Sequence, residues 1–150
     1  MCGTNNDCGV TTCPLTTSLW VNLTNGVEDD IDFRVNEGGT PSGNTGPSVD
    51  FNPGTVTGNY AYTEASGGCT GQTAILESAC IQLNQNYSFV FAYHLFGSTT
   101  GSLHLDLKVG GAWIEDFVTP IVGDQGNAWQ TRIVSLTAYA GSFKSVFHKP

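Results

Sequence analysis

The sequence predicts an all-β fold in which two antiparallel sheets pack face to face. Three observations carry this prediction. Polar and apolar residues alternate with a period of two in several runs, turn-forming dipeptides separate the runs, and no amphipathic stretch with a helical period exceeds two turns. Short strands joined by Gly- and Pro-rich turns are typical of β-sandwiches and barrels.

The expected strands show the alternation that a half-buried sheet requires. In Ser102–Val109, four aliphatic side chains point to one face and the intervening polar ones point to the other, which we expect to face water. The run Tyr87–Phe96 is apolar at most positions, so we expect it to be covered on both faces. The remaining expected strands are Ser18–Asn25, Asn59–Ser66, Ala112–Val118, Trp129–Leu136 and Phe143–His148.

Turn signals fill the gaps between these runs, as Asn25-Gly26 and Gly110-Gly111 illustrate. The longest gap, Asn36–Gly58, is rich in Gly, Pro, Ser and Thr and carries no run of charge. Because strands of one domain flank it, we expect an ordered surface loop rather than a linker. Long loops inside compact domains are commonly functional.

Length and composition restrict the class of protein. A chain of 150 residues makes one domain, which we divide into a Cys-containing N-terminal segment (1–17) and a sandwich (18–150). Thirteen acidic residues face five Lys and Arg, for a net charge of −8, so no basic patch is available and nucleic acid is excluded as a partner. No run approaches the roughly 20 apolar residues of a membrane helix, so we expect no membrane insertion.

Cysteine usage indicates an oxidising compartment. Five cysteines without a CxxC pair are typical of secreted, extracellular or cell-surface proteins. The first residues lack the basic and apolar regions of a signal peptide, so we interpret the chain as a mature fragment whose export signal was removed.

Short motifs follow one another in a fixed order: Asp29-Asp30-Ile31-Asp32-Phe33, Gly39–Pro47, Tyr60–Ser66, Ala74–Ser78 with Cys80, Phe91–Gly97 and Gly126–Gln130. From about Val27 to Gly141 this order resembles the MAM domain, the extracellular module shared by meprins, neuropilins and receptor tyrosine phosphatases. Phe33 replaces the family's Trp. The resemblance implies a jelly-roll-like β-sandwich, and it implies adhesion or binding rather than catalysis.

The chain departs from the family pattern at both ends. The acid-rich closing strand expected after Phe143 is missing or replaced, which predicts an open sheet edge through which copies of the chain self-associate. Cys2, Cys8 and Cys13 also lie outside the usual pattern. The arrangement of the other two cysteines is most similar to bacterial secreted members.

Cys69 and Cys80 are eleven positions apart and flank a turn at Gly71. We interpret them as a disulfide, which would contribute about 2–3 kcal/mol by restricting the unfolded chain. A zinc site is the poorer interpretation because no His or third Cys lies at ligand spacing. Of the three N-terminal cysteines at most two pair with each other, and the sequence does not say which.

Glu28, Asp29, Asp30 and Asp32 place four carboxylates within five positions. One interpretation is a solvated acidic turn; the other is a site for a hard cation such as Ca²⁺, although the spacing is not that of an EF-hand. Because some MAM relatives hold a structural cation, the resemblance makes Asp30 and Asp32 candidate ligands, with Glu64 as a third oxygen donor. No cofactor is required beyond this cation.

Three tryptophans admit two interpretations. Large aromatic side chains usually fill the core, and we expect this of Trp129. Trp113 and Trp20 are the candidate ligand-binding residues if the domain is instead a carbohydrate-binding module with exposed indoles.

A third function class is a small secreted hydrolase. His104 and Asp106 share one face of an expected strand, and Ser102 is the nucleophile such an enzyme would need. No nucleophile elbow or HExxH motif accompanies them. We therefore predict no catalytic residues and no enzymatic activity. The expected function is adhesion or protein interaction within a larger secreted or cell-surface polypeptide, through the Asn36–Gly58 loop or a sheet face, with a protein or glycan ligand at the cell surface.

Overall fold

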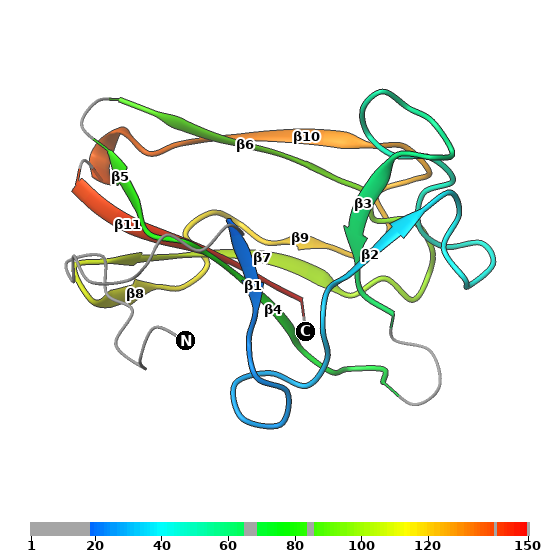
Figure 1. The fold of residues 1–150 in the computed structure, drawn as a ribbon, viewed down its shortest axis with the longest axis horizontal. Coiled ribbons are helices and arrows are strands. Elements are labelled where there is room, and N and C mark those ends of the chain that lie inside the picture. Colours follow the sequence, from blue (N-terminus) through cyan, green and yellow to red (C-terminus); the bar gives the residue numbers. More distant parts are fainter. Residues whose placement is uncertain (1–18, 65–68, 84–85, 140, 150) are drawn as a thin grey trace.

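The computed structural model describes residues 19–64, 69–83, 86–139 and 141–149 (Figure 1). Within these residues the chain forms a series of strands and one 3₁₀ turn. The elements are β1 (Trp20–Asn22), β2 (Arg34–Glu37), β3 (Asn59–Tyr62), β4 (Ala74–Ser78), β5 (Ile81–Leu83), β6 (Ser88–Tyr93), β7 (Ser102–Val109), β8 (Ala112–Ile114), β9 (Ile121–Val122), β10 (Gln130–Ser135), η1 (Thr137–Tyr139) and β11 (Gly141–Lys149).

The strands build two layers and a terminal ribbon. A seven-stranded sheet has the order β1-β4-β11-β7-β8, with β5 paired to β11 and β9 paired to β7. The antiparallel pair β6–β10 forms the facing layer, and the antiparallel pair β2–β3 crosses one end (Figure 1). The predicted all-β antiparallel sandwich is therefore confirmed.

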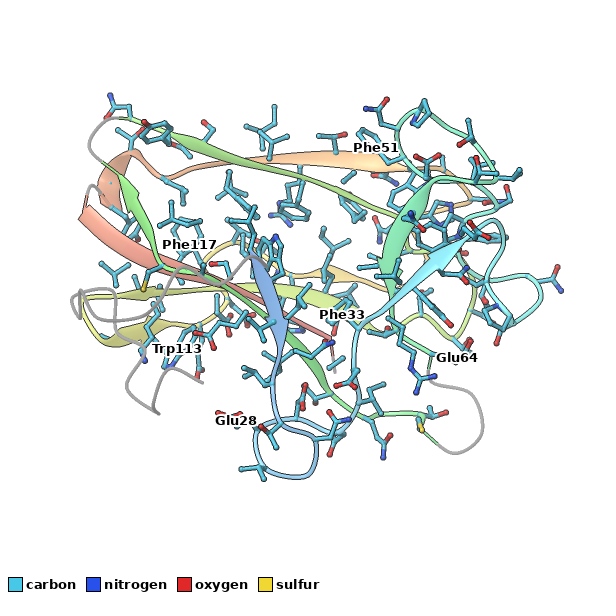
Figure 2. The ribbon with its side chains drawn as sticks, in the orientation of Figure 1. Glu28, Phe33, Phe51, Glu64, Trp113 and Phe117 are labelled. Carbon is cyan, nitrogen blue, oxygen red and sulfur yellow. The ribbon has the colours of Figure 1, made fainter. Side chains whose placement is uncertain are left out.

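The core lies between the inward faces of the two layers. From the large sheet Leu105 and Leu107 are buried, and from the facing side Val134 and Leu136 are buried. Phe117 points into the same interior, where its ring meets that of Tyr139 edge to face at 5.1 Å (Figure 2). Fully burying a side chain of this kind contributes about 1.5–3 kcal/mol, which is the main reason that the two layers stay together.

The prediction that β6 is covered on both faces is wrong. Val90 is 56% exposed, and Ile133, its partner on β10, is 70% exposed. Because β6 belongs to a two-stranded layer, only its inner face meets the rest of the sandwich. The inner side chains of β6 form a ladder of rings in which Phe89 and Phe91 lie 5.6 Å apart and Phe91 and Tyr93 lie 6.1 Å apart.

The outward face of β7 is less open than the alternation predicts. Asp106 is 8% exposed, because the segment after β8 folds back alongside β7. The Phe117 backbone N–H donates to the Leu105 carbonyl at 2.9 Å, and β9 then pairs with Ser102 and Leu103.

The C-terminal strand β11 is central in the sheet, with β4 on one side and β7 on the other. The sheet is thus continuous where the sequence departs from the family pattern, and β1 and β8 are the outer strands of its order. Self-association through an open edge stays a prediction. Among the described residues, no helix is long and apolar enough to cross a membrane.

Candidate functional site

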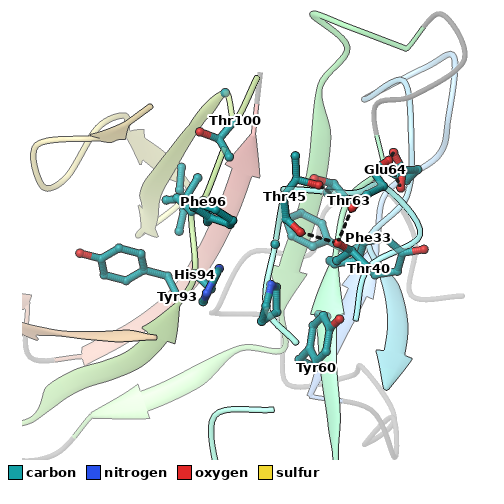
Figure 3. Close-up of a pocket in the computed structure, with 18 of the residues that line it drawn as sticks. Phe33, Thr40, Thr45, Tyr60, Thr63, Glu64, Tyr93, His94, Phe96 and Thr100 are labelled. Carbon is teal, nitrogen blue, oxygen red and sulfur yellow. Dashed lines mark hydrogen bonds between the residues drawn. The ribbon is translucent and has the colours of Figure 1, made fainter. Parts of the chain in front are cut away.

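A cavity of about 930 Å³ lies at the end of the sandwich beneath the Asn36–Gly58 loop; we call it the loop cavity (Figure 3). The loop and β3 form one wall, and the segment from β6 to the start of β7 forms the other. Binding sites for small molecules typically have volumes of about 300–1,000 Å³. The cavity is therefore large enough to admit a ligand.

Trp129 stands at the centre of an aromatic wall. Its ring lies 5.9 Å from Tyr60, 5.5 Å from His94 and 6.0 Å from Phe51, each in an edge-to-face arrangement. The indole Nε1–H donates to the Val49 carbonyl at 2.8 Å. Trp129 is only partly buried and lines the cavity, so the prediction that it fills the core is not confirmed; its role is to fasten the long loop to the sandwich.

Hydrogen bonds hold the loop in shape. The Thr40 hydroxyl donates to the Thr45 carbonyl at 2.7 Å, and the Thr45 hydroxyl donates to the Ser42 carbonyl at 3.1 Å. Further along, the buried Asp50 carboxylate accepts from the Gly54 and Thr55 backbone N–H groups. The sequence prediction of an ordered surface loop rather than a linker is confirmed.

Two polar side chains of the cavity wall stand out. Gln72 Oε1 and His94 Nδ1 are buried and have no hydrogen-bond partner among the described residues. Burial lowers the pKa of the His94 imidazole below its ordinary value, against the opposing effect of a hydrogen bond with Asn127. Sequence reasoning missed both residues. The sequence feature that could have identified His94 as a candidate site residue is its titratable side chain within the otherwise apolar run Phe91–Gly97.

The predicted Cys69–Cys80 disulfide is not formed. Cys69 carries a free thiol, whereas Cys80 is disulfide-bonded. The strand β4 lies between the two positions, and its first and last Cα atoms are four steps of about 3.3 Å, or roughly 13 Å, apart. A disulfide needs Cα atoms within about 7 Å. The pairing of Cys2, Cys8 and Cys13 lies outside the described residues.

The predicted cation ligands Asp30, Asp32 and Glu64 do not converge. Glu64 accepts from the Ser42 hydroxyl at the rim of the loop cavity, and Figure 2 shows it well away from the loop that carries Glu28. Among the described residues, no three His, Cys, Asp or Glu side chains are placed to hold a metal ion.

The acidic residues instead fasten their loop to the start of β4. Asp30 Oδ2 accepts from the Thr73 backbone N–H at 2.9 Å, and Asp29 Oδ2 accepts from Ile75 at the same distance. The Asn25 amide, with its nitrogen turned toward the acids, donates to Asp29 and Asp32 at 3.0 Å each. These bonds hold the acidic loop against β4, and a cation at this loop stays a prediction.

The two candidate ligand-binding indoles lie on opposite outer strands. Trp113 on β8 is 46% exposed and points away from the interior, with Lys108 Nζ 5.5 Å from its ring (Figure 2). Trp20 on β1 packs toward the facing layer, 6.3 Å from Phe89. They do not form one flat platform.

Ser102, His104 and Asp116 form a hydrogen-bonded chain. His104 Nε2 lies 2.9 Å from Ser102 Oγ, and His104 Nδ1 lies 2.6 Å from Asp116 Oδ1. Asp116 has a φ of +47°, an uncommon value for a non-glycine residue, and its N–H donates to the buried Asp106 carboxylate at 2.8 Å. The sequence predicted a strand over Ala112–Val118, but β8 ends at Ile114 and Asp116 lies in the turn that follows, so sequence reasoning missed its role.

Fold and site together define a β-sandwich module with one long ordered loop over a cavity. The family model of the MAM domain (meprin/A5/mu) matches residues 6–149, and the chain belongs to this family. The match is wider than the resemblance indicated and includes residues up to the C-terminal strand. MAM domains are extracellular, non-enzymatic modules that mediate adhesion and protein interactions.

Curated relatives carry the same module within much longer chains. The chain is 33% identical over 111 residues to neuropilin-1a of Danio rerio, covering 69% of this chain and 12% of that protein. It is 36% identical over 107 residues to MAM domain-containing glycosylphosphatidylinositol anchor protein 1 of Gallus gallus, covering 69% and 11%. It is 33% identical over 98 residues to MAM domain-containing protein 2 of Homo sapiens, covering 65% and 14%. These relatives are vertebrate proteins and lend no support to a bacterial origin.

The buried carboxyl of Asp29 makes the free energy of unfolding depend on pH in the acidic range. Burial raises the pKa of its carboxyl; the hydrogen bond from Ile75 opposes this, and the charges of Asp32, Asp30 and Glu28 add to it. The folded state therefore binds this proton more tightly than the unfolded state does, and its contribution to stability is lost as the pH rises through the raised pKa. We expect Asp29→Asn to raise the Tm at pH 7 and to flatten this part of the Tm-against-pH profile. Identical profiles for the variant and the parent would contradict this.

Gly58 is packed against the carboxylate that shapes the loop. A Cβ atom at Gly58 would overlap the Asp50 carboxylate, so Gly58→Ala must displace that side chain and should cost about 1–3 kcal/mol of unfolding free energy. Gly39→Ala is the matched control because its Cβ would meet no atom within 4 Å. Urea denaturation measures both variants, and equal midpoints would show that Asp50 does not hold the loop.

Proposed function

We propose that this chain is a non-catalytic extracellular module that binds a cell-surface protein through its Asn36–Gly58 loop, as part of a larger polypeptide. The observation that carries the proposal is a loop held rigid by its own hydrogen bonds yet carrying exposed apolar side chains. Val56 is 63% exposed and Phe51 is 50% exposed. A preformed loop loses little conformational entropy when it binds, so such side chains can contribute efficiently to affinity.

Two further observations support this assignment. Membership of a family of extracellular interaction modules supports an extracellular compartment and a binding role. The net charge of −8 leaves a neutral or basic protein surface as the favoured partner, because an acidic surface would be repelled.

Binding of the fluorescently labelled chain to intact vertebrate cells tests the proposal. We expect saturable binding that protease treatment of the cells removes. Val56→Asp should weaken it at least about fivefold, because a charge would enter the apolar contact. Val27→Asp is the matched control, since Val27 is equally apolar and 79% exposed but lies outside the loop. Binding that survives the protease, or that responds equally to both variants, would refute the proposal.

A second candidate function, a serine hydrolase, is favoured by one observation. The contacts of His104 with Ser102 and Asp116 have the order and the atoms of the Ser-His-Asp chain in such enzymes. In that chemistry Ser102 Oγ bonds to the carbonyl carbon of an ester while His104 Nε2 takes the hydroxyl proton and passes it to the leaving alcohol. Against it, Ser102 is not among the residues that line the loop cavity.

A fluorophosphonate probe separates the two functions. A hydrolase would give one covalent adduct at Ser102, detected by peptide mass spectrometry, lost in Ser102→Ala and strongly reduced in Asp116→Asn. For an interaction module we expect no adduct above that of the heat-denatured protein. In that case the three residues serve to fix the segment after β8 onto β7.

A further inference from the structure

The unpartnered acceptor atoms of the loop cavity restrict what can occupy it. Buried polar atoms nearly always have hydrogen-bond partners, yet Gln72 Oε1 and His94 Nδ1 have none among the described residues. Both residues line the same cavity. Water molecules can donate hydrogen bonds to both atoms while no ligand is bound. A ligand that displaces this water must supply its own hydrogen-bond donors.

The protonation state of His94 makes its contribution specific. Since Nδ1 is the atom without a partner, the hydrogen bond with Asn127 involves Nε2. That bond favours a proton on Nε2, and burial keeps the ring neutral, so Nδ1 presents a lone pair. The cavity therefore offers two acceptors, which suit the hydroxyl or N–H groups of a ligand.

The charges along the wall argue for a neutral ligand. None of the described residues that line the cavity is Lys or Arg, so a phosphate or carboxylate would find no counter-charge. The two acids present are already engaged: Asp50 accepts from loop backbone N–H groups, and Glu64 accepts from Ser42. They are thus committed to the loop rather than free to fix a cation.

The aromatic wall supplies the complementary apolar contact. Tyr60, Trp129, His94 and Phe96 form a continuous array with ring-to-ring distances of 5.9, 5.5 and 6.4 Å. Figure 3 shows His94 and Phe96 on one side of the cavity facing the loop side chains on the other. Hydroxyl groups, including those of Thr45 and Thr100, also line it. Rings beside hydroxyls suit a molecule with one apolar C–H face and a polar rim.

We propose that the loop cavity binds a neutral saccharide, which donates hydroxyl hydrogen bonds to Gln72 Oε1 and His94 Nδ1 and lays its C–H face on the aromatic wall. The ligand is a free sugar or the terminal unit of a glycan chain. The site is distinct from the indoles of Trp113 and Trp20, and it is additional to the loop surface proposed to bind a protein.

Calorimetric titration of the full chain with neutral sugars tests this proposal. The probes are glucose, galactose, mannose, N-acetylglucosamine and their common disaccharides, with N-acetylneuraminic acid as an anionic comparison. We expect one or more neutral sugars to bind at a single site and the anionic sugar to bind at least tenfold more weakly. Failure of every neutral sugar to bind at millimolar concentration, or preference for the anionic sugar, would overturn the proposal.

Matched variants locate the site. Gln72→Leu and His94→Phe each remove one acceptor while keeping the side chain's approximate size, and each should weaken sugar binding about five- to tenfold. The Tm should stay the same or rise, because an unsatisfied buried acceptor is removed. Trp113→Ala should leave affinity unchanged. Binding that is lost in Trp113→Ala but retained in the two cavity variants would refute the assignment. Val56→Asp separates this outcome from protein binding, since it should affect cell binding alone.

Discussion

The attachment of Trp129 to the long loop is the constraint on which the candidate site depends. One indole satisfies the Val49 carbonyl and meets rings from the loop, from β3 and from the end of β6. The loop with the adjoining strand β3, and the distant end of β6, are thereby held around one side chain. Without it the loop would keep its internal hydrogen bonds but lose its position over the cavity. The same contact thus orders both the surface proposed to bind a protein and the wall proposed to bind a sugar.

Much of the fold follows from local pattern, and the differences have physical causes. The strand Ser102–Val109 coincides with β7 because alternation is a direct consequence of one face being buried. The apolar run that includes β6 led to the wrong prediction that both faces of the strand are covered. Continuous hydrophobicity does not show whether a strand is central in a sheet or belongs to a two-stranded layer. The short strand β9 gave no signal because two residues are too few to show a period.

Chemistry at the sites was less predictable, because it depends on which segments meet. The acidic residues at 28–32 predicted a cation site. In the structure, two of them accept hydrogen bonds from the backbone N–H groups of Thr73 and Ile75, and no local sequence pattern predicts this contact between distant segments. Cys69 and Cys80 are close in the sequence, but the strand β4 lies between them.

Ser102 and His104 were paired correctly because residues two apart on a strand share a face. Asp116 completes that chain from the turn after β8, and alternation along a strand does not predict which turn residue will contact a neighbouring strand.

The place of β11 in the sheet has a consequence for biosynthesis. It is the last strand of the chain, yet it inserts between β4 and β7, and it also carries β5. As the ribosome delivers the chain from its N-terminus, β4 and β7 emerge with facing edges that nothing yet bridges. The nascent domain must therefore wait for residues 141–149 before its largest sheet can close. During that interval its unpaired edges are open to wrong partners, so any factor that shields them would favour a correctly assembled module.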